Sequence, residues 1–243
     1  HGRTSGYMMQ IFIITPFPAI PEAVIGESIL RRAGEKEIVD YHMIDLREFT
    51  EGKHRQIDDY PFGGGTGMVM LAEPIMKAMD RVRELYNGDK GLRVVFPSPQ
   101  AKVLSQETSR DLSEADGIAF ICGHYKGIDE RVRETVVTDE ISIGDYVVTG
   151  GELPAMVILD SVVRLIPGVL GDEESANTDS FAHDLLDHPH YTRPEEVKGL
   201  KVPEVLMSGH HANVDAWRQE QRELRTKNNR PDLWEHYQEE LLK

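Results

Sequence analysis

Short apolar runs alternate with amphipathic segments along the first two thirds of the chain. Three runs rich in apolar and β-branched residues, each bounded by proline or glycine, lie at residues 9–17, 93–99 and 117–123. Such runs predict short buried strands. Residues 22–35 and 72–88 instead carry apolar positions at helical spacing, and the second segment ends on Asn87 and Gly88, a common stop signal. Strand and helix in this order predict an α/β fold with a mostly parallel sheet, which binds ligands at the carboxyl ends of its strands.

The pattern changes at Gly168. From there to Leu185 the chain is acidic and polar without core periodicity, which indicates an interdomain linker or a mobile loop. Helical patterns return at residues 213–227 and 231–243. We therefore expect a sheet domain, a linker and a small helical C-terminal domain, at residues 8–168, 169–188 and 189–243.

Length and composition are those of a globular protein of one or two domains. The 243 residues are 40% hydrophobic and 28% charged, which is enough to bury a sizeable core. No run approaches the roughly 18 apolar residues of a membrane span, and no signal-peptide pattern opens the chain. The single Cys122 cannot form an intrachain disulfide, so we expect a cytoplasmic protein. Residues 1–7 show neither periodicity and are expected to be residual cloning sequence.

The formal net charge of −15 argues against a protein that coats nucleic acid through bulk electrostatics. Any contact with nucleic acid therefore requires a local basic patch. One candidate lies on a single face of the helix predicted at 213–227 and continues beyond it, with Arg218, Arg222, Arg225, Lys227 and Arg230. The alternative is a solvated helix in which Glu220 and Glu223 supply the counter-charges.

The stretch IGDYVVTGGELPA, residues 143–155, passes from a predicted strand into a predicted helix. Its two glycines, Gly150 and Gly151, indicate a sharp turn, and Pro154 suits the first turn of the helix. The chain has neither a P-loop nor the dinucleotide fingerprint, so a neutral or zwitterionic ligand fits the turn better than a phosphate. The alternative is a tight connection that binds nothing.

Two other predicted strand ends carry similar irregularities, PSPQ at 97–100 and CGHYKGIDERV at 122–132. If the strands are neighbours, the three loops converge on one crevice lined by backbone groups, Tyr125 and Tyr146. Such a lining suits an adenine-like ring, in keeping with small-molecule sites that have few polar anchors.

Long motifs extend this picture. The chain carries, in order, YPFGGGTGMVM, PSPQ, CGHYKGIDERV, SIGDYVVTGGELPAMVILDSVVRLIPGVLG and LLDHPHYTRPE. In these motifs and their order the chain resembles the TrmD-like bacterial tRNA (guanine-N1)-methyltransferases of the SPOUT class, from Met9 to the C-terminus. The resemblance implies a deep trefoil knot, S-adenosylmethionine (AdoMet) as cosubstrate, an obligate homodimer with its active site at the subunit interface, and methylation of tRNA at N1 of guanosine 37, on the 3′ side of the anticodon.

The resemblance also implies roles for individual residues. Asp179 would be the general base and Arg164 would stabilise O6 of the guanine. AdoMet would contact Ser98, Pro99, Gly123, Tyr125, Lys126, Ile143, Gly144, Tyr146, Val148, Gly150, Gly151 and Pro154. Contacts to tRNA would come from His54, Arg55, Asp58, Gly67 and Ser175, and the basic helix face adds Arg218 and Arg222.

Simpler roles remain open for several of these side chains. Arg164 lies four residues after Asp160, so the two could form a surface ion pair near a helix end. Asp179 could be a loop residue or a helix N-cap. Asp58 could belong to a solvent-facing turn.

The chain departs from the family at His124 and Lys126, where the family commonly has arginine and glutamate. Because that glutamate is linked to magnesium dependence, Lys126 leaves a magnesium role possible but unsupported by the sequence. The histidines at 183, 188, 190, 210 and 211 match no standard zinc spacing, so no metal site is expected. Two other classes are alternatives. A hydrolase-like or phosphoryl enzyme is disfavoured because its motifs are absent from the sequence, and the other alternative is a non-catalytic nucleotide-binding or RNA-binding module.

Overall fold

A computed structural model describes residues 8–171, 179–181 and 184–242. The chain divides into two compact units, His1–Gly171 and Asp172–Lys243. Within the described ranges, no helix is both long and apolar enough to cross a membrane.

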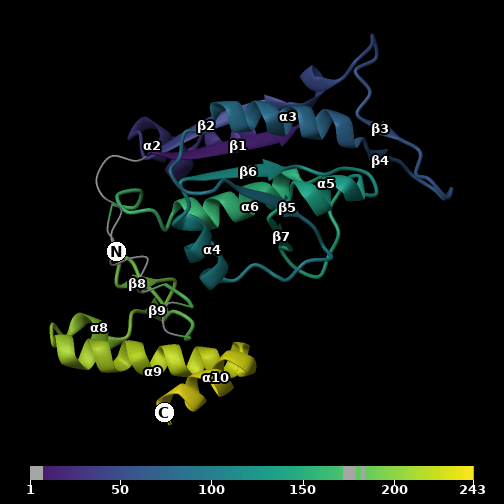
Figure 1. Cartoon of the computed structure of the whole chain (residues 1–243). Coiled ribbons are helices and arrows are strands. Elements are labelled where there is room, and N and C mark those ends of the chain that lie inside the picture. The colour runs from purple at the N-terminus through teal and green to yellow at the C-terminus, as the bar shows by residue number, and fades with distance from the viewer. Residues whose placement is uncertain (1–7, 172–178, 182–183, 243) are drawn as a thin grey trace. The chain divides into compact units, whose positions relative to one another are not determined.

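The first unit is built on a five-stranded parallel sheet with the strand order β2-β1-β6-β5-β7 (Figure 1). The strands are β1 (Met9–Thr15), β2 (Val39–Asp45), β5 (Arg93–Pro97), β6 (Gly117–Ile121) and β7 (Asp139–Ile141). Every residue of β1 and β6 is buried, as expected for central strands covered on both faces. The predicted α/β fold with a mostly parallel sheet is therefore confirmed.

Helices cover both faces of this sheet. They are α1 (Ala19–Ile25), α2 (Ser28–Glu35), α3 (Ala72–Leu85), α4 (Gln106–Ser113), α5 (Glu130–Thr135) and α6 (Glu152–Val163), with a short 3-10 helix, η1 (Leu46–Phe49). One core packs α2, α4 and α6 against the sheet, and a second core packs α3, α5 and η1 against the other face (Figure 1). The helix α6 is apolar on nearly all sides, which is typical of a helix buried on several faces.

A small antiparallel hairpin extends from this unit and consists of β3 (Asp58–Asp59) and β4 (Val69–Met70) (Figure 1). Its loop contains four glycines with positive φ, at positions 63, 64, 65 and 67, so the backbone there follows a path that other residues rarely adopt. Tyr60 and Phe62 in this loop are exposed.

The second unit contains a two-stranded hairpin and three helices. These elements are β8 (Glu196–Val197), β9 (Leu200–Lys201), α8 (Glu204–Met207), α9 (His211–Asn229) and α10 (Pro231–Leu241). The long helix α9 packs against α10, and the fully buried Thr226 of α9 accepts a hydrogen bond from the backbone of Leu186 at 2.8 Å. Pro231 occupies the first turn of α10, where its missing amide proton costs nothing.

One expectation about the elements was wrong. The helix predicted at 22–35 is two helices, because α1 ends on Gly26 and the chain re-enters helix at Ser28 with a positive φ of 50°. The helix predicted at 72–88 is confirmed as α3, which begins at Ala72 but already ends at Leu85, before the glycine. The strands β2 and β7 were not predicted, since polar side chains interrupt the first and the second is only three residues long.

Candidate functional site

The loops that follow β5, β6 and β7 line one cleft in the first unit, with a volume of about 770 Å³. These three strands are adjacent in the sheet, so their carboxyl ends meet at one edge. The structure brings all twelve residues predicted to contact AdoMet to this cleft: Ser98, Pro99, Gly123, Tyr125, Lys126, Ile143, Gly144, Tyr146, Val148, Gly150, Gly151 and Pro154. A volume of this size suits a small organic ligand.

The glycines of the turn before α6 are required by close packing. Neither Gly150 nor Gly151 has a positive φ, so the sharp bend predicted there does not depend on glycine's conformational freedom. A Cβ on Gly151 would lie 2.6 Å from the backbone nitrogen of Gly123. A Cβ on Gly150 would lie 2.4 Å from the ring of His124. The loops after β6 and β7 therefore approach each other too closely for any larger residue.

Backbone hydrogen bonds join the three loops. The amide of Gly151 donates to the carbonyl of Gly123 at 2.8 Å, and His124 forms a β-bridge with Gly150. The loop after β5 pairs with the loop after β7, since Leu104 donates to the Ser142 carbonyl at 2.8 Å and Ser142 donates to Lys102 at 2.9 Å. The cleft is thus a connected backbone structure assembled from distant parts of the chain.

Two tyrosines stand at the cleft, each about half exposed. Tyr125 has a positive φ of 60°, an uncommon conformation for a bulky residue and one that concentrates at functional sites. Tyr146 donates its hydroxyl proton to the carbonyl of Ile143 at 3.3 Å, and its ring lies directly over Gly144. Both rings offer faces on which a planar ligand could stack.

A buried polar group beside the cleft was not predicted from the sequence. Glu152, the first residue of α6, is only 2% exposed and accepts a 2.6 Å hydrogen bond from Thr15 Oγ1. Its carboxylate also lies 2.8 Å and 2.9 Å from His124 Nε2. Burial raises the pKa of Glu152, but the hydrogen bonds from His124 and Thr15 outweigh burial and leave this pKa below its usual value. The sequence signal that could have identified this group is the acidic residue Glu152 directly after Gly150 and Gly151.

The hairpin β3–β4 joins the cleft through its second strand. Met70 donates to the Gly127 carbonyl at 3.0 Å, and the amide of Lys126 donates to the Met68 carbonyl at 3.0 Å. Gly67, predicted to contact guanine, lines the cleft beside Lys126. Asp58 lies in β3 and does not line the cleft, nor do the exposed His54 and Arg55 of the preceding loop.

The predicted O6 stabiliser, Arg164, also lies outside the cleft. It caps the C-terminus of α6, whereas Pro154 in the first turn of the same helix lines the cleft. At a rise of about 1.5 Å per residue, the backbones of these two positions are roughly 15 Å apart. The backbone amide of Arg164 donates a hydrogen bond to the carbonyl of Asp160 at 3.2 Å. Asp160 is the residue whose side chain could form a surface ion pair with Arg164, which is the alternative role for this arginine.

The remaining predicted residues belong to the second unit. Asp179 lies among the described residues and is half-buried, whereas Ser175 lies outside them. On α9, Arg218 is about half exposed and pairs with Asp215 at 3.2 Å. Arg222 is mostly covered and lies 3.3 Å from the carboxylate of Asp187. Among the described residues, Asp215 and Asp187 therefore supply counter-charges to these two arginines.

One cluster of possible metal ligands occurs in the described residues, although no metal site was expected. Asp187, His188 and His190 place their ligand atoms within 4.8 Å of one another. His190 Nε2 lies 2.7 Å from the Asp187 carboxylate, which Arg222 also contacts. The guanidinium of Arg222 therefore already places a positive charge beside the Asp187 carboxylate.

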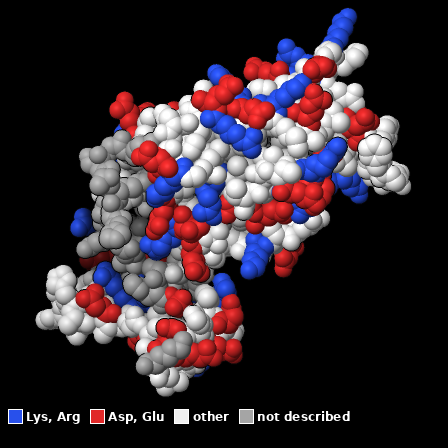
Figure 2. All heavy atoms as spheres, viewed as in Figure 1, with Lys and Arg blue, Asp and Glu red and all other residues white. Residues whose placement is uncertain are grey.

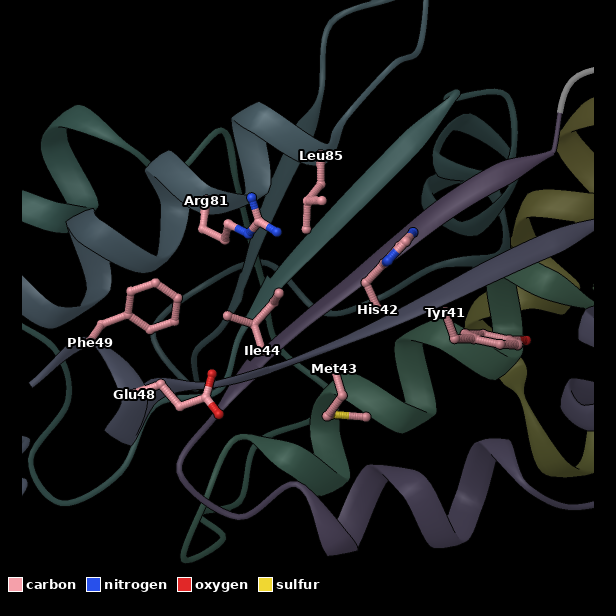
Figure 3. A pocket seen from close by; sticks show the side chains of 8 residues that line it. All are labelled: Tyr41, His42, Met43, Ile44, Glu48, Phe49, Arg81 and Leu85. Atoms are coloured by element: carbon pink, nitrogen blue, oxygen red, sulfur yellow. The ribbon is translucent and has the colours of Figure 1, made fainter.

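A second, more open pocket of about 540 Å³ lies along β2 (Figure 3). Residues from β2, η1 and α3 line it: Tyr41, His42, Met43, Ile44, Glu48, Phe49, Arg81 and Leu85. His42 and Ile44 point to one side of the strand and Tyr41 and Met43 to the other (Figure 3). None of the predicted site residues lines this pocket, so the cleft above is the better candidate.

Comparison with known proteins agrees with the motifs. A family model described as tRNA (Guanine-1)-methyltransferase TrmD matches residues 9–236. A protein named tRNA (guanine-N(1)-)-methyltransferase from Staphylococcus carnosus is 53% identical over 229 residues, 94% of this chain and 92% of the relative. Proteins of the same name from Shouchella clausii and Brevibacillus brevis are each 52% identical, over 95% and 93% of this chain and 93% and 92% of their own lengths.

Proposed function

The chain belongs to the tRNA (guanine-1)-methyltransferase family, and on this premise we propose that it methylates N1 of a guanine in tRNA with AdoMet as methyl donor. The observation that carries the proposal is the convergence of three loops on one cleft of small-molecule size. We further propose that the target is guanosine 37, next to the anticodon on its 3′ side, and that the protein acts in the cytoplasm.

The donor set of the cleft fits AdoMet. The cleft is lined mainly by backbone and by small or apolar side chains, with two half-exposed tyrosines for an adenine ring. Of the charged residues around it, Arg133 is already paired with Glu140 at 2.8 Å and Glu130 at 3.0 Å, which leaves Lys126 as the cation nearest to a ligand carboxylate. When bound, AdoMet supplies an electrophilic methyl group on its sulfonium centre.

The protein's own residues then account for the proton and the charge. We assign Asp179 as the base that accepts the N1 proton of guanine while the new N1–carbon bond forms. Negative charge develops on O6, and the guanidinium of Arg164 stabilises it, which also makes N1 easier to deprotonate. We assign Asp58 and Gly67 to contacts with the guanine and His54 and Arg55 to contacts with the RNA backbone. Ser175 is assigned to a contact with the substrate, and Arg218 and Arg222 are assigned to the tRNA body.

We base the next part of the proposal on the position of Arg164. Its backbone lies about 15 Å along α6 from that of the cleft-lining Pro154, and Arg164 does not line the cleft of its own subunit. We propose a homodimer in which the partner supplies the carboxylate and guanidinium to the cleft. Two apolar side chains of α6 support this proposal, since Leu153 is 58% exposed and Val157 is 50% exposed on a helix whose other apolar residues are buried. Their four-residue spacing places them on one face.

We also propose that the chain forms a trefoil knot and that its domains have the limits 8–168, 169–188 and 189–243. No residue is assigned as a ligand of a metal ion in the reaction. The paired loops after β5, β6 and β7 are the contacts expected of a knot, which is a rare exception to unthreaded chain topology. Lys126 at the cleft offers ammonium chemistry, so any magnesium requirement would not arise from that position.

Incubation of the protein with labelled AdoMet and unmodified tRNA transcripts tests the function. We expect label at N1 of guanosine 37 in transcripts that carry guanosine at position 36, and much less when either guanosine is replaced. A lack of incorporation into every transcript, by protein that still binds AdoMet, would overturn the proposed reaction.

A further inference from the structure

We propose that Glu152 and His124 form a charge pair that fixes the cleft for its ligand, so that ligand affinity falls when His124 loses its proton. This inference rests on the proposed use of the cleft for AdoMet. It assigns positioning roles to both residues, and no contact of Glu152 with the reacting atoms is involved.

The first support is the burial of the carboxylate. Glu152 is 2% exposed, and a carboxylate removed from water is costly unless hydrogen bonds and an opposite charge compensate it. Thr15 Oγ1 supplies one hydrogen bond at 2.6 Å, but a hydroxyl carries no charge. Among the described residues, the ion pairs found for Glu152 involve only His124, whose side chain is 15% exposed.

The second support is the position of the pair between the loops. Thr15 ends β1, His124 follows β6 and Glu152 begins α6, so their hydrogen bonds join three segments of the chain. Gly123 and Gly150, the neighbours of this pair, both line the cleft. A Cβ on Gly150 would collide with both partners, 2.4 Å from the His124 ring and 2.7 Å from the Glu152 carboxylate. Both partners therefore pack directly against the backbone of Gly150 in the cleft wall.

The surroundings of His124 show which other groups could respond to pH. The ring of Phe17 lies 4.9 Å from that of His124, and the guanidinium of Arg47 lies 5.6 Å from the centre of the Phe17 ring. Tyr125 makes an edge contact with His124 at 6.2 Å. Cys122, two residues before His124, is buried. Burial together with the charge of Glu152 raises the pKa of its thiol well above the ordinary value. Histidine is, as a side-chain type, the one whose charge most readily changes near neutral pH.

The test measures AdoMet affinity by titration calorimetry at about pH 6 and about pH 8.5. The amino group of AdoMet also titrates near this range. The affinity of each protein at each pH is therefore expressed as a ratio to the affinity of Glu152→Gln, in which the buried charge is absent. We expect wild-type affinity to fall about tenfold relative to Glu152→Gln as pH rises over this range, which corresponds to a loss of about 1.4 kcal/mol of binding free energy. His124→Gln should bind weakly at both pH values, and adding Glu152→Gln to it should restore affinity.

His42→Gln is the matched control, because His42 also pairs with a carboxylate, Asp40 at 2.7 Å, but lines the other pocket (Figure 3). It should keep the wild-type profile. Thermal melting without ligand identifies any variant that fails to fold, in which case the comparison of wild type with Glu152→Gln still decides. Identical pH profiles for these two proteins, or wild-type affinity in His124→Gln, would overturn the inference. Absence of AdoMet binding by the wild type at both pH values would instead overturn the proposed function.

Discussion

Asp179 is the residue at which binding and chemistry can be separated. Replacement by asparagine keeps the shape of the side chain and removes the proton acceptor. We expect Asp179→Asn to retain AdoMet affinity and to lower single-turnover methylation by about 10²- to 10⁴-fold, the usual contribution of a general base. Asp184→Asn, a nearby change with no assigned role, is the control. Wild-type rates in Asp179→Asn would exclude it as the base.

Gly151 offers a test of the close approach between the loops. A methyl group there would meet backbone atoms, 2.6 Å from the Gly123 nitrogen and 2.9 Å from Cys122 Cα, which cannot rotate away. We expect Gly151→Ala to lower the free energy of unfolding by about 1–3 kcal/mol and to weaken AdoMet binding. Gly91→Ala, where a Cβ would meet nothing within 4 Å, should change stability by less than about 0.5 kcal/mol. Chemical unfolding of both variants checks the difference.

At the scale of elements, α6 links the cofactor cleft to the proposed dimer. Leu153→Glu combined with Val157→Glu would place two charges on its exposed apolar face. We expect a monomer by light scattering, an unchanged far-UV circular dichroism spectrum and loss of methylation, because a buried unpaired charge costs several kcal/mol. The control Leu200→Glu, on the exposed strand β9, should leave association unchanged. A variant of α6 that remains dimeric would contradict the proposed interface.

The basic face of α9 has fewer arginines available to contact RNA than its sequence suggests. Acidic side chains alternate with basic ones over the face of the molecule shown in Figure 2, and Arg222 is committed to Asp187. Arg218→Gln should weaken tRNA binding and lower the salt slope by about 1, whereas adding Arg222→Gln should also lower the melting temperature. Arg81→Gln on α3 is the control. Binding measured from low to moderate salt decides, and an unchanged slope would mean that Arg218 only contacts solvent.

The predictability of each element follows from what holds it in place. The central strands β1, β5 and β6 were evident because burial on both faces demands continuous apolar residues. The strand β2 was not, because its alternating polar residues reflect an edge position that only the assembled sheet defines. The cleft loops were recognised from glycine and from family motifs. The Glu152 group was missed, since its partners His124 and Thr15 lie 28 and 137 residues away and local periodicity cannot register such pairs.

At the scale of the whole molecule, paired carboxylates set the response to acid. Burial raises the pKa of Asp139, but hydrogen bonds from Arg93 and Thr138 outweigh it and leave this pKa lowered. A lowered folded-state pKa gives stability that is complete above the unfolded value, near about 4, and lost as pH falls through the folded value.

We therefore expect Asp139→Asn to reduce the unfolding free energy at neutral pH by about 2 kcal/mol and to flatten its decline in acid. Denaturant unfolding from about pH 3 to pH 7 measures both effects. Asp80→Asn removes an exposed pair with Arg83 and should cost less than about 1 kcal/mol. Equal losses in the two variants would show that burial of the Asp139 pair adds nothing.

The open margins of the sheet bear on how the protein avoids uncontrolled self-association. A long, flat and hydrophobic edge strand would expose unpaired amides and carbonyls, with which the strands of other molecules could pair and form fibrils. Here one margin, β7, has only three residues, two of them acidic, and the other, β2, carries Asp40 and His42. Strand-to-strand polymerisation is thereby discouraged at both margins, so the sheet itself offers no template for open-ended assembly.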